Sequence, residues 1–297
     1  MKINRLLMLL PLLLLLGSCY KDYVDDYVYS SVGFAIANPV RTVIADRDME
    51  IRLGVSIGGK RAVDKSDWAR FEVDPTLLTG TVFQLLPAEY YTLSNANTFT
   101  VQKDNLPVAD VGLTFTPAFY ADEKAVSNYY ALPLRIKDHS LDSIMTGKGS
   151  TVAVIRYINT YHGTYYVKGS LYEMDNGNLV NTTVYNDKDL VKNITRDLKT
   201  TGQYTLERPG LANFVVTGTE KMKFTVTPGS GESNTVTVET AQGGVVITEG
   251  EGQYFPRKTN PEFTVKYAFT KGGKTYKAED TLVLRQDPLL DLRVETW

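Results

Sequence analysis

The segment Phe263-Thr264-Val265-Lys266-Tyr267-Ala268-Phe269 decides the fold of the second half of the chain. Its odd-numbered residues are apolar or aromatic, and this period of two is typical of a β-strand with one buried face. Lys271-Gly272-Gly273-Lys274 then supplies a turn. The return strand carries a second apolar face, made of Tyr276, Ala278, Leu282 and Leu284. The pattern predicts a β-hairpin.

Further hairpins precede it. Asn176-Gly177 is a strong type I′ turn signal between two extended segments. Residues 222–226 and 236–238 alternate in the same way across a Gly- and Ser-containing loop. Eight or nine consecutive antiparallel strands could close into a barrel, which removes exposed edges. A second open sandwich is the alternative.

The first half also indicates strands. Residues 49–57 alternate between apolar and polar, and residues 151–158 form a nearly continuous apolar run. Pro133 within residues 130–136 implies a sheet edge or a bulge. Short strands at regular spacing without a long helix predict a β-sandwich over residues 28–159, followed by a β-barrel domain over residues 160–297. The fold class is therefore all-β.

One segment favours a helix. Leu190, Ile194 and Leu198 are four residues apart, the spacing of one helical face, so residues 188–199 are predicted to be helical. Asp187 and Asp189 precede this segment, where carboxylates favour the start of a helix.

The N-terminus has the organisation of a secretory signal. Lys2 and Arg5 precede an apolar run that is too short to span a bilayer. Leu16-Gly17-Ser18-Cys19 resembles the bacterial lipobox, which predicts a signal peptide over residues 1–18 and lipidation of Cys19. An ordinary signal peptide that contains a cysteine is the alternative. Cys19 is the only cysteine, so a disulfide within the chain is excluded.

Residues 19–27 are predicted to be a lipidated tether. A lysine followed by acidic residues resembles the surface-export signal of Bacteroidota lipoproteins, and a plain solvated spacer is the alternative. The predicted location is the outer membrane, lipid-anchored and facing the cell exterior.

Composition limits the class of partner and of chemistry. The 32 Lys and Arg residues nearly balance the 34 Asp and Glu residues, which argues against a nucleic-acid partner. The two histidines, His139 and His162, belong to no metal-binding pattern, and no nucleophile or phosphate-binding motif is present. We therefore expect no metal, no cofactor and no catalytic residues.

Three aromatic segments are candidate ligand sites, because sugars bind aromatic faces together with directional hydrogen bonds. They are Trp68 in a polar loop, Tyr161 and His162 at the domain boundary, and Tyr254, Phe255 and Arg257 in a second loop. The alternative for each is a loop aromatic that folds over the edge of its own domain.

Two regions resemble known modules. Residues 86–93 (LPAEYYTL) and 130–136 (YALPLRI) resemble the immunoglobulin-like N-terminal domain of Bacteroidota surface lipoproteins, which also precedes some endo-N-acetylglucosaminidases. Those enzymes carry an Asp-x-x-Asp-x-Asp-x-Glu motif on a βα barrel. This chain has neither, so the activity does not carry over. Residues 163–166 to 281–285 resemble the lipocalin-like β-barrel domain often paired with that module.

The resemblance implies a role in polysaccharide utilisation. The leading hypothesis is a non-catalytic surface lipoprotein that binds complex glycans and works with a transporter or a glycoside hydrolase. An adhesin or assembly subunit that binds a protein is a second hypothesis. An unrecognised hydrolase with paired carboxylates facing a pocket is the third.

Overall fold

The computed structural model describes residues 29–47, 49–60, 63–101, 106–216, 218–243, 245–293 and 295–297. The predicted signal peptide and tether, with Cys19, lie outside the described residues. Within this described part, no helix is long and apolar enough to cross a membrane.

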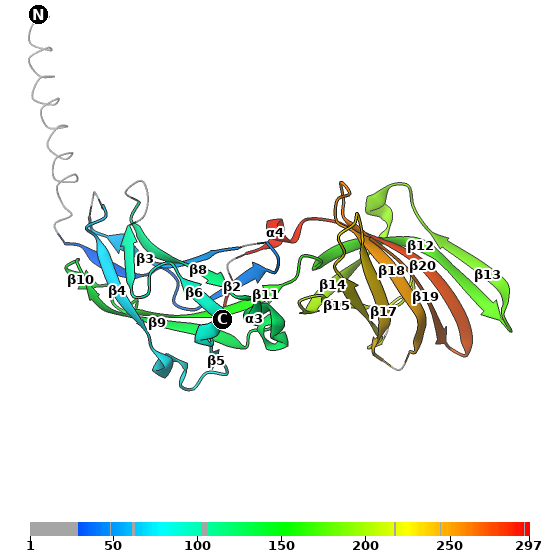
Figure 1. Cartoon of the computed structure of the whole chain (residues 1–297), viewed down its shortest axis with the longest axis horizontal. Helices are drawn as coiled ribbons and strands as arrows, with labels where there is room; N and C mark the ends of the chain where they lie inside the picture. Colours follow the sequence, from blue (N-terminus) through cyan, green and yellow to red (C-terminus); the bar gives the residue numbers. More distant parts are fainter. Residues whose placement is uncertain are drawn as a thin grey trace, which may run out of the picture.

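The first half is a twelve-stranded sheet that curls over itself into a sandwich (Figure 1). Its main path runs β10-β1-β3-β8-β7-β4-β9-β11-β2-β21, with β5 paired to β9 and β6 to β8. The strands are β1 (Ser31–Phe34), β2 (Pro39–Ile44), β3 (Ile51–Gly58), β4 (Trp68–Val73), β5 (Gln84–Leu85), β6 (Tyr91–Leu93), β7 (Thr98–Val101), β8 (Val108–Phe115), β9 (Tyr130–His139), β10 (Ser143–Ile144), β11 (Ser150–Ile158) and β21 (Glu295–Thr296).

The alternation along β3 places its apolar residues in the sandwich core. Ile51, Leu53, Val55 and Ile57 are all buried, and they pack with aromatic residues such as Phe99. Pro133 lies in β9 between the residues paired to β5 and those paired to β4, so no strand on that side needs the N–H that proline lacks. Its carbonyl still accepts the Asp74 N–H at 3.1 Å. The sandwich prediction is confirmed.

The second half is a closed antiparallel barrel of eight strands, as the resemblance implied. The order is β12-β14-β15-β16-β17-β18-β19-β20, and β12 pairs with β20 to close it. The strands are β12 (Gly163–Asp175), β14 (Ile194–Gly202), β15 (Thr205–Pro209), β16 (Lys221–Thr227), β17 (Asn234–Gln242), β18 (Ile247–Phe255), β19 (Glu262–Lys271) and β20 (Lys274–Leu284). A ninth strand, β13 (Asn178–Tyr185), pairs with β12 outside the closed ring.

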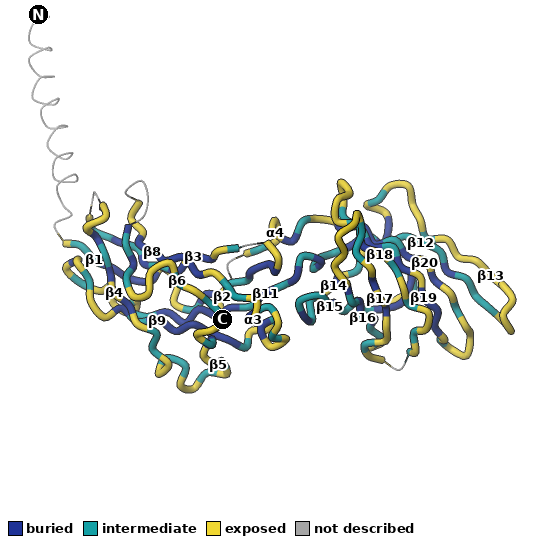
Figure 2. Tube along the Cα trace, viewed as in Figure 1, coloured by how far each residue is buried: buried dark blue, intermediate teal, exposed yellow. Residues whose placement is uncertain are grey.

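The barrel interior is a packed aromatic core. Phe263, Val265, Tyr267 and Phe269 point inward, as their alternation predicts, and all are almost fully buried. In Figure 2 the buried stretches of the barrel, drawn dark blue, lie along its strands, and the loops at its ends are mostly yellow. Both predicted two-residue turns have positive φ, since Asn176 and Gly177 lie at 48° and 83° and Gly272 and Gly273 at 58° and 75°.

The predicted helix over residues 188–199 is wrong. Only the 3₁₀ helix η4 (Leu190–Lys192) forms there, and the chain continues as β14. A spacing of four is also a multiple of two, so Ile194 and Leu198 share one face of a strand as well as one face of a helix. The other helices are equally short: η1 (Pro75–Leu78), η2 (Ala88–Tyr90), α3 (Pro117–Ala121), η3 (Glu123–Val126) and α4 (Pro288–Asp291).

The last residues correct the assignment of residues 160–297 to the barrel alone. After β20 the chain returns to the sandwich, where β21 pairs with β2. The Trp297 indole N–H donates to the carbonyl of Val152 at 2.9 Å, and its ring meets Phe83 edge-on with centroids 4.6 Å apart. Arg47 of the sandwich binds both oxygens of Asp287, at 3.2 and 2.9 Å. The C-terminal segment therefore fastens the barrel to the sandwich.

Candidate functional site

Trp68 is the first residue of β4, not a loop residue as the sequence suggested. Ala69 and Phe71 of the same strand are buried in the core, so Trp68 and Arg70 lie on the opposite, outer face. The Arg70 guanidinium carbon is 5.1 Å from the centre of the indole ring. Trp68 is half-buried, and this outer face stays a candidate sugar surface.

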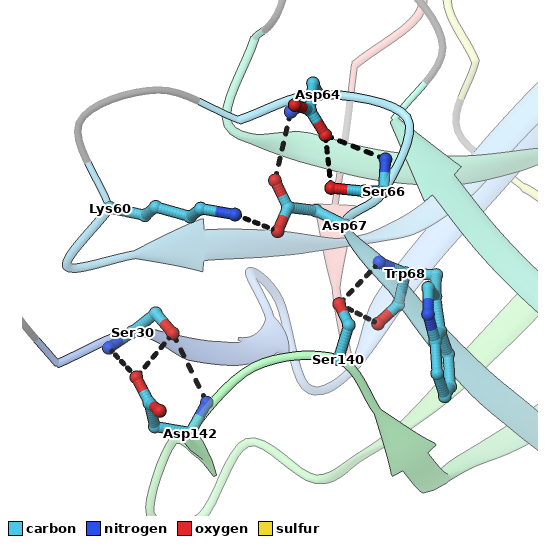
Figure 3. Close-up of polar contacts among 8 residues, drawn as sticks. All are labelled: Ser30, Lys60, Asp64, Ser66, Asp67, Trp68, Ser140 and Asp142. Carbon is cyan, nitrogen blue, oxygen red and sulfur yellow. Dashed lines mark hydrogen bonds and ion pairs between the residues drawn. The ribbon is translucent and has the colours of Figure 1, made fainter.

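The polar residues around Trp68 fix the local backbone (Figure 3). The Trp68 N–H donates to the Ser140 hydroxyl at 2.9 Å, and that hydroxyl donates back to the Trp68 carbonyl at 3.3 Å. Asp67 is buried, forms an ion pair with Lys60 and accepts the Asp64 N–H at 3.0 Å. These groups position β4 but leave the indole ring itself without a hydrogen bond to them.

A second group of hydrogen bonds in Figure 3 links Ser30, just before β1, to Asp142. The Ser30 N–H and hydroxyl both donate to one carboxylate oxygen of Asp142, each at 2.7 Å. These hydrogen bonds lower the pKa of Asp142 from its ordinary value. The contact joins the first described residues to the loop before β10.

Contrary to the sequence prediction, Tyr161 and Tyr254 do not lie in loops open to a ligand. Both are buried in the barrel core, with 4% and 3% of their surface exposed. Their rings meet edge-on with centroids 4.9 Å apart, and burial raises the pKa of Tyr161 to about 12. Sequence alone does not show that the boundary segment and the end of β18 pack together, so its pattern indicates aromatic residues in loops.

His162 lies at the junction of the two domains. Its Nδ1 accepts the Thr200 N–H at 3.1 Å, so the neutral ring carries its proton on Nε2, and burial lowers its pKa. It lines a pocket of about 260 Å³, smaller than the roughly 300–1,000 Å³ of small-molecule sites. Arg156 in the same pocket is bound to Glu295 at 3.1 Å and Thr42 at 2.9 Å. These contacts fasten the C-terminal segment.

Phe255 and Arg257 lie on the outside of the barrel. Phe255 is half-buried with the Lys258 amine 4.8 Å from its ring centre, and Arg257 is exposed. Arg257 lines an open depression of about 730 Å³ together with Lys168, Lys188 and Lys258. Trp68 belongs to the other domain, so the predicted ligand residues do not form a single site.

The structure reveals a site that the sequence did not indicate, on the outer wall of the barrel. Two depressions of about 760 and 600 Å³ share Glu251, Lys266 and Glu279. The second depression also shares Asn186 with the depression around Arg257. We call this series of three depressions the barrel-wall groove. Tyr172 lines its first depression and Arg257 its last.

Three glycines shape the groove. Gly169, Gly250 and Gly252 all line it, and a Cβ at each would lie about 2 Å from a carbonyl oxygen of the neighbouring strand (2.1, 1.8 and 2.2 Å). The neighbouring strands can approach this closely only where no side chain is present. β18 is also bulged between Thr248 and Glu251. The wall therefore departs from a regular cylinder here.

The groove carries balanced charge and many hydrogen-bonding groups. Lys266 binds Glu279 at 2.8 Å, which raises the pKa of the lysine, and Lys277 lies 3.7 Å from Glu249. Hydroxyl and amide side chains fill the space between: Ser170, Gln253, Thr264 and Thr281. The residues alternate as on any solvent-facing strand, so no sequence signal marks them. Among the residues described, no group of three or more His, Cys, Asp and Glu is placed to hold a metal.

Comparisons with known proteins show how widely this fold is shared. A family model described as "-like, N-terminal domain" matches residues 25–143. No curated protein matches the chain. A structural-genomics protein of unknown function from Bacteroides ovatus is 18% identical with a TM-score of 0.71, over 91% of this chain and 99% of the other. That similarity shows a shared fold along almost the whole of both chains.

Two further structures are more distant. An auxiliary nutrient binding protein from Bacteroides thetaiotaomicron is 14% identical with a TM-score of 0.40, over 87% of this chain and 95% of the other. EndoBT-3987 from the same organism, solved with a Man5GlcNAc product, is 21% identical with a TM-score of 0.31, over 40% of this chain and 28% of its own. All three similar structures come from Bacteroides.

Proposed function

We propose that this protein is a non-catalytic accessory of polysaccharide utilisation that binds a complex glycan in the barrel-wall groove. The observation that carries the proposal is the groove itself, a series of linked depressions of about 760, 600 and 730 Å³. Such a series can accept an elongated ligand over several units. A single enclosed cavity would suit a compact ligand instead.

The chemistry of the groove suits sugars. Tyr172 offers an aromatic ring against which the C–H face of a pyranose can pack. The threonine and glutamine side chains beside it can donate and accept hydrogen bonds, as hydroxyl groups require. In the first two depressions the lysines are paired with carboxylates, Lys266 with Glu279 and Lys277 with Glu249, so a polyanion meets no concentrated positive surface there.

The cellular setting is part of the proposal and is supported by the sequence. The lipobox-like segment ending at Cys19 supports lipid anchoring, and the acidic tether supports display on the outer face of the outer membrane. In that position a transporter or a glycoside hydrolase would be the natural protein partner. A stable lipid anchor needs more than one acyl chain.

A glycan-array screen of the chain from Tyr20 onward tests the proposal, with hits followed by calorimetry and by product analysis. We expect saturable binding of an oligosaccharide that remains intact. No binding across plant and host glycans would contradict the proposal and favour the protein-binding alternative. A hit that is cleaved would favour a hydrolase, with Glu251 and Glu279 the first carboxylates to substitute.

Single substitutions then separate the two candidate surfaces. Arg257→Ala removes a donor from the last depression of the groove, whereas Trp68→Ala removes the aromatic ring from the sandwich. We expect weaker glycan binding from Arg257→Ala and unchanged binding from Trp68→Ala. The reverse result would place the glycan on the sandwich.

A further inference from the structure

The barrel closes without β13, and this leaves a strand with a free edge. β13 pairs with β12 on one side, and no strand of the described residues pairs with its other side. In Figure 1 the β12–β13 hairpin flares away from the barrel, and in Figure 2 nearly all of β13 is exposed. An edge strand presents unpaired N–H and C=O groups to any strand that can align with it.

β13 has neither a charge nor a proline to protect this edge, and its one irregularity is a bulge at Val180, where the pairing with β12 shifts register. Its eight residues, Asn178–Tyr185, include no charged residue and no proline. Its apolar side chains are open to solvent, with Leu179 58%, Val180 60% and Val184 65% exposed. A long, neutral edge with exposed valines is suited to pairing with another strand.

The strand is also complementary to itself. In an antiparallel pair centred on Thr182, Asn181 of one copy lies opposite Thr183 of the other. Val184 of each copy then reaches the bulged Val180 of the other copy, and the two-fold axis repeats this apolar contact. No charged residue between 178 and 185 meets a like charge in this register. We infer that β13 is the dimerisation edge of this protein, and that it pairs antiparallel with β13 of a second copy around Thr182.

This register determines where the grooves lie. Thr182 and Val184 pair with Tyr172 and Ser170 of β12, which line the barrel-wall groove. A two-fold axis through Thr182 is perpendicular to the sheet and keeps each residue on its own face. The dimer therefore presents both grooves on the same side. If the proposed function holds, one long glycan can engage both, which raises avidity without any new contact.

Sedimentation equilibrium over a range of concentrations tests the dimer without any glycan. It uses the chain from Tyr20 onward, which contains every described residue. We expect the wild type to form a reversible dimer. Val184→Lys replaces the apolar side chain at both Val180–Val184 contacts of the dimer with a charged one. It should raise the Kd of the dimer at least about tenfold. The control is Val246→Lys at an equally exposed valine (66%), which should leave the Kd unchanged.

A cysteine tests the register. This form of the chain has no cysteine, since the single one is Cys19, so Thr182→Cys introduces the only thiol. Opposed residues of an antiparallel pair are about 4.5–5.5 Å apart at Cα, within the range for a disulfide. We expect Thr182→Cys to form a covalent dimer under mild oxidation. Thr237 is also exposed, but it lies on β17, which is paired on both sides, so Thr237→Cys should stay monomeric.

Three results would overturn the inference. The first is a wild type that remains monomeric at every concentration, which would leave the edge for a different partner. The second is equal loss of the dimer in Val246→Lys and Val184→Lys. The third is equal crosslinking of the two cysteine variants. None of these outcomes depends on glycan binding, so failure of the dimer and failure of the proposed function can be told apart.

Discussion

Substitution of Asp280 probes the most buried polar cluster of the barrel. Asp280 and Arg208 have fully buried side chains and form an ion pair at 2.7 Å. The Tyr267 hydroxyl donates to the same carboxylate at 2.9 Å, and the Tyr185 hydroxyl donates to its other oxygen. The Ala212 N–H in turn donates to the Tyr267 hydroxyl at 2.7 Å. One carboxylate therefore joins β13, β15, β19, β20 and the loop that follows β15.

The expected cost follows from what Asp280→Ala leaves behind. The Arg208 guanidinium stays inside the barrel without a counter-ion, and breaking a buried pair in this way costs about 3–5 kcal/mol. The adjacent residue gives a matched control on the same strand. Glu279 points outward and binds Lys266 with both side chains largely exposed, so Glu279→Ala should cost only about 0–1 kcal/mol.

Urea unfolding followed by two signals measures this difference. Both tryptophans lie on the sandwich, Trp68 in β4 and Trp297 against Val152, so their fluorescence reports on that domain. Far-UV circular dichroism also follows the barrel. We expect Asp280→Ala to destabilise the barrel transition by about 3–5 kcal/mol. A loss no larger than that of Glu279→Ala would refute the idea that the cluster stabilises the barrel.

Three further predictions concern single residues. Hydrogen bonds from Thr76 and Arg135 lower the pKa of Asp74 from 3.8 to about 2. The ionised Asp74 therefore stabilises the folded protein above pH 3.8, and this stabilisation is lost as the pH falls towards 2. The unfolding free energies of wild type and Asp74→Asn should converge over that range. Trp297→Ala should cost the sandwich about 1–2 kcal/mol by thermal unfolding, less than a fully buried aromatic, because the residue is 40% exposed. Gly252→Ala should destabilise the barrel by about 1–3 kcal/mol in urea, because the new Cβ would lie 2.2 Å from a carbonyl oxygen; an unchanged midpoint would contradict that geometry.

The hairpins were predictable because their signals are local. The alternation in residues 263–269 and the Asn176-Gly177 turn each determine the conformation of their own segment. The strand conformation of residues 190–198 was not predictable in this way, because a spacing of four between apolar residues fits both a helix and a strand. Arg196 lies between Ile194 and Leu198 on the same face of that strand, so a charged residue interrupts the apolar alternation that would have indicated the inward face.

The site was harder to predict because it depends on contacts between distant strands. Tyr161 and Tyr254 are 93 positions apart in the numbering and meet only in the folded core. The groove arises where strands meet without side chains between them, at Gly169 and Gly252, and neither glycine is part of a recognisable motif. Its polar lining has the alternation of any outward-facing strand.

Calorimetric titration of a hit glycan against a matched pair of tyrosine variants tests the central claim most directly. Tyr172 lines the groove, whereas Tyr166 is a half-buried tyrosine of the same strand on the same outer face. An aromatic contact contributes about 0.5–1.5 kcal/mol, so Tyr172→Ala should weaken binding by up to about tenfold. Tyr166→Ala should bind as the wild type does. Equal affinities for wild type and Tyr172→Ala, with both variants folded, would contradict glycan binding in the barrel-wall groove.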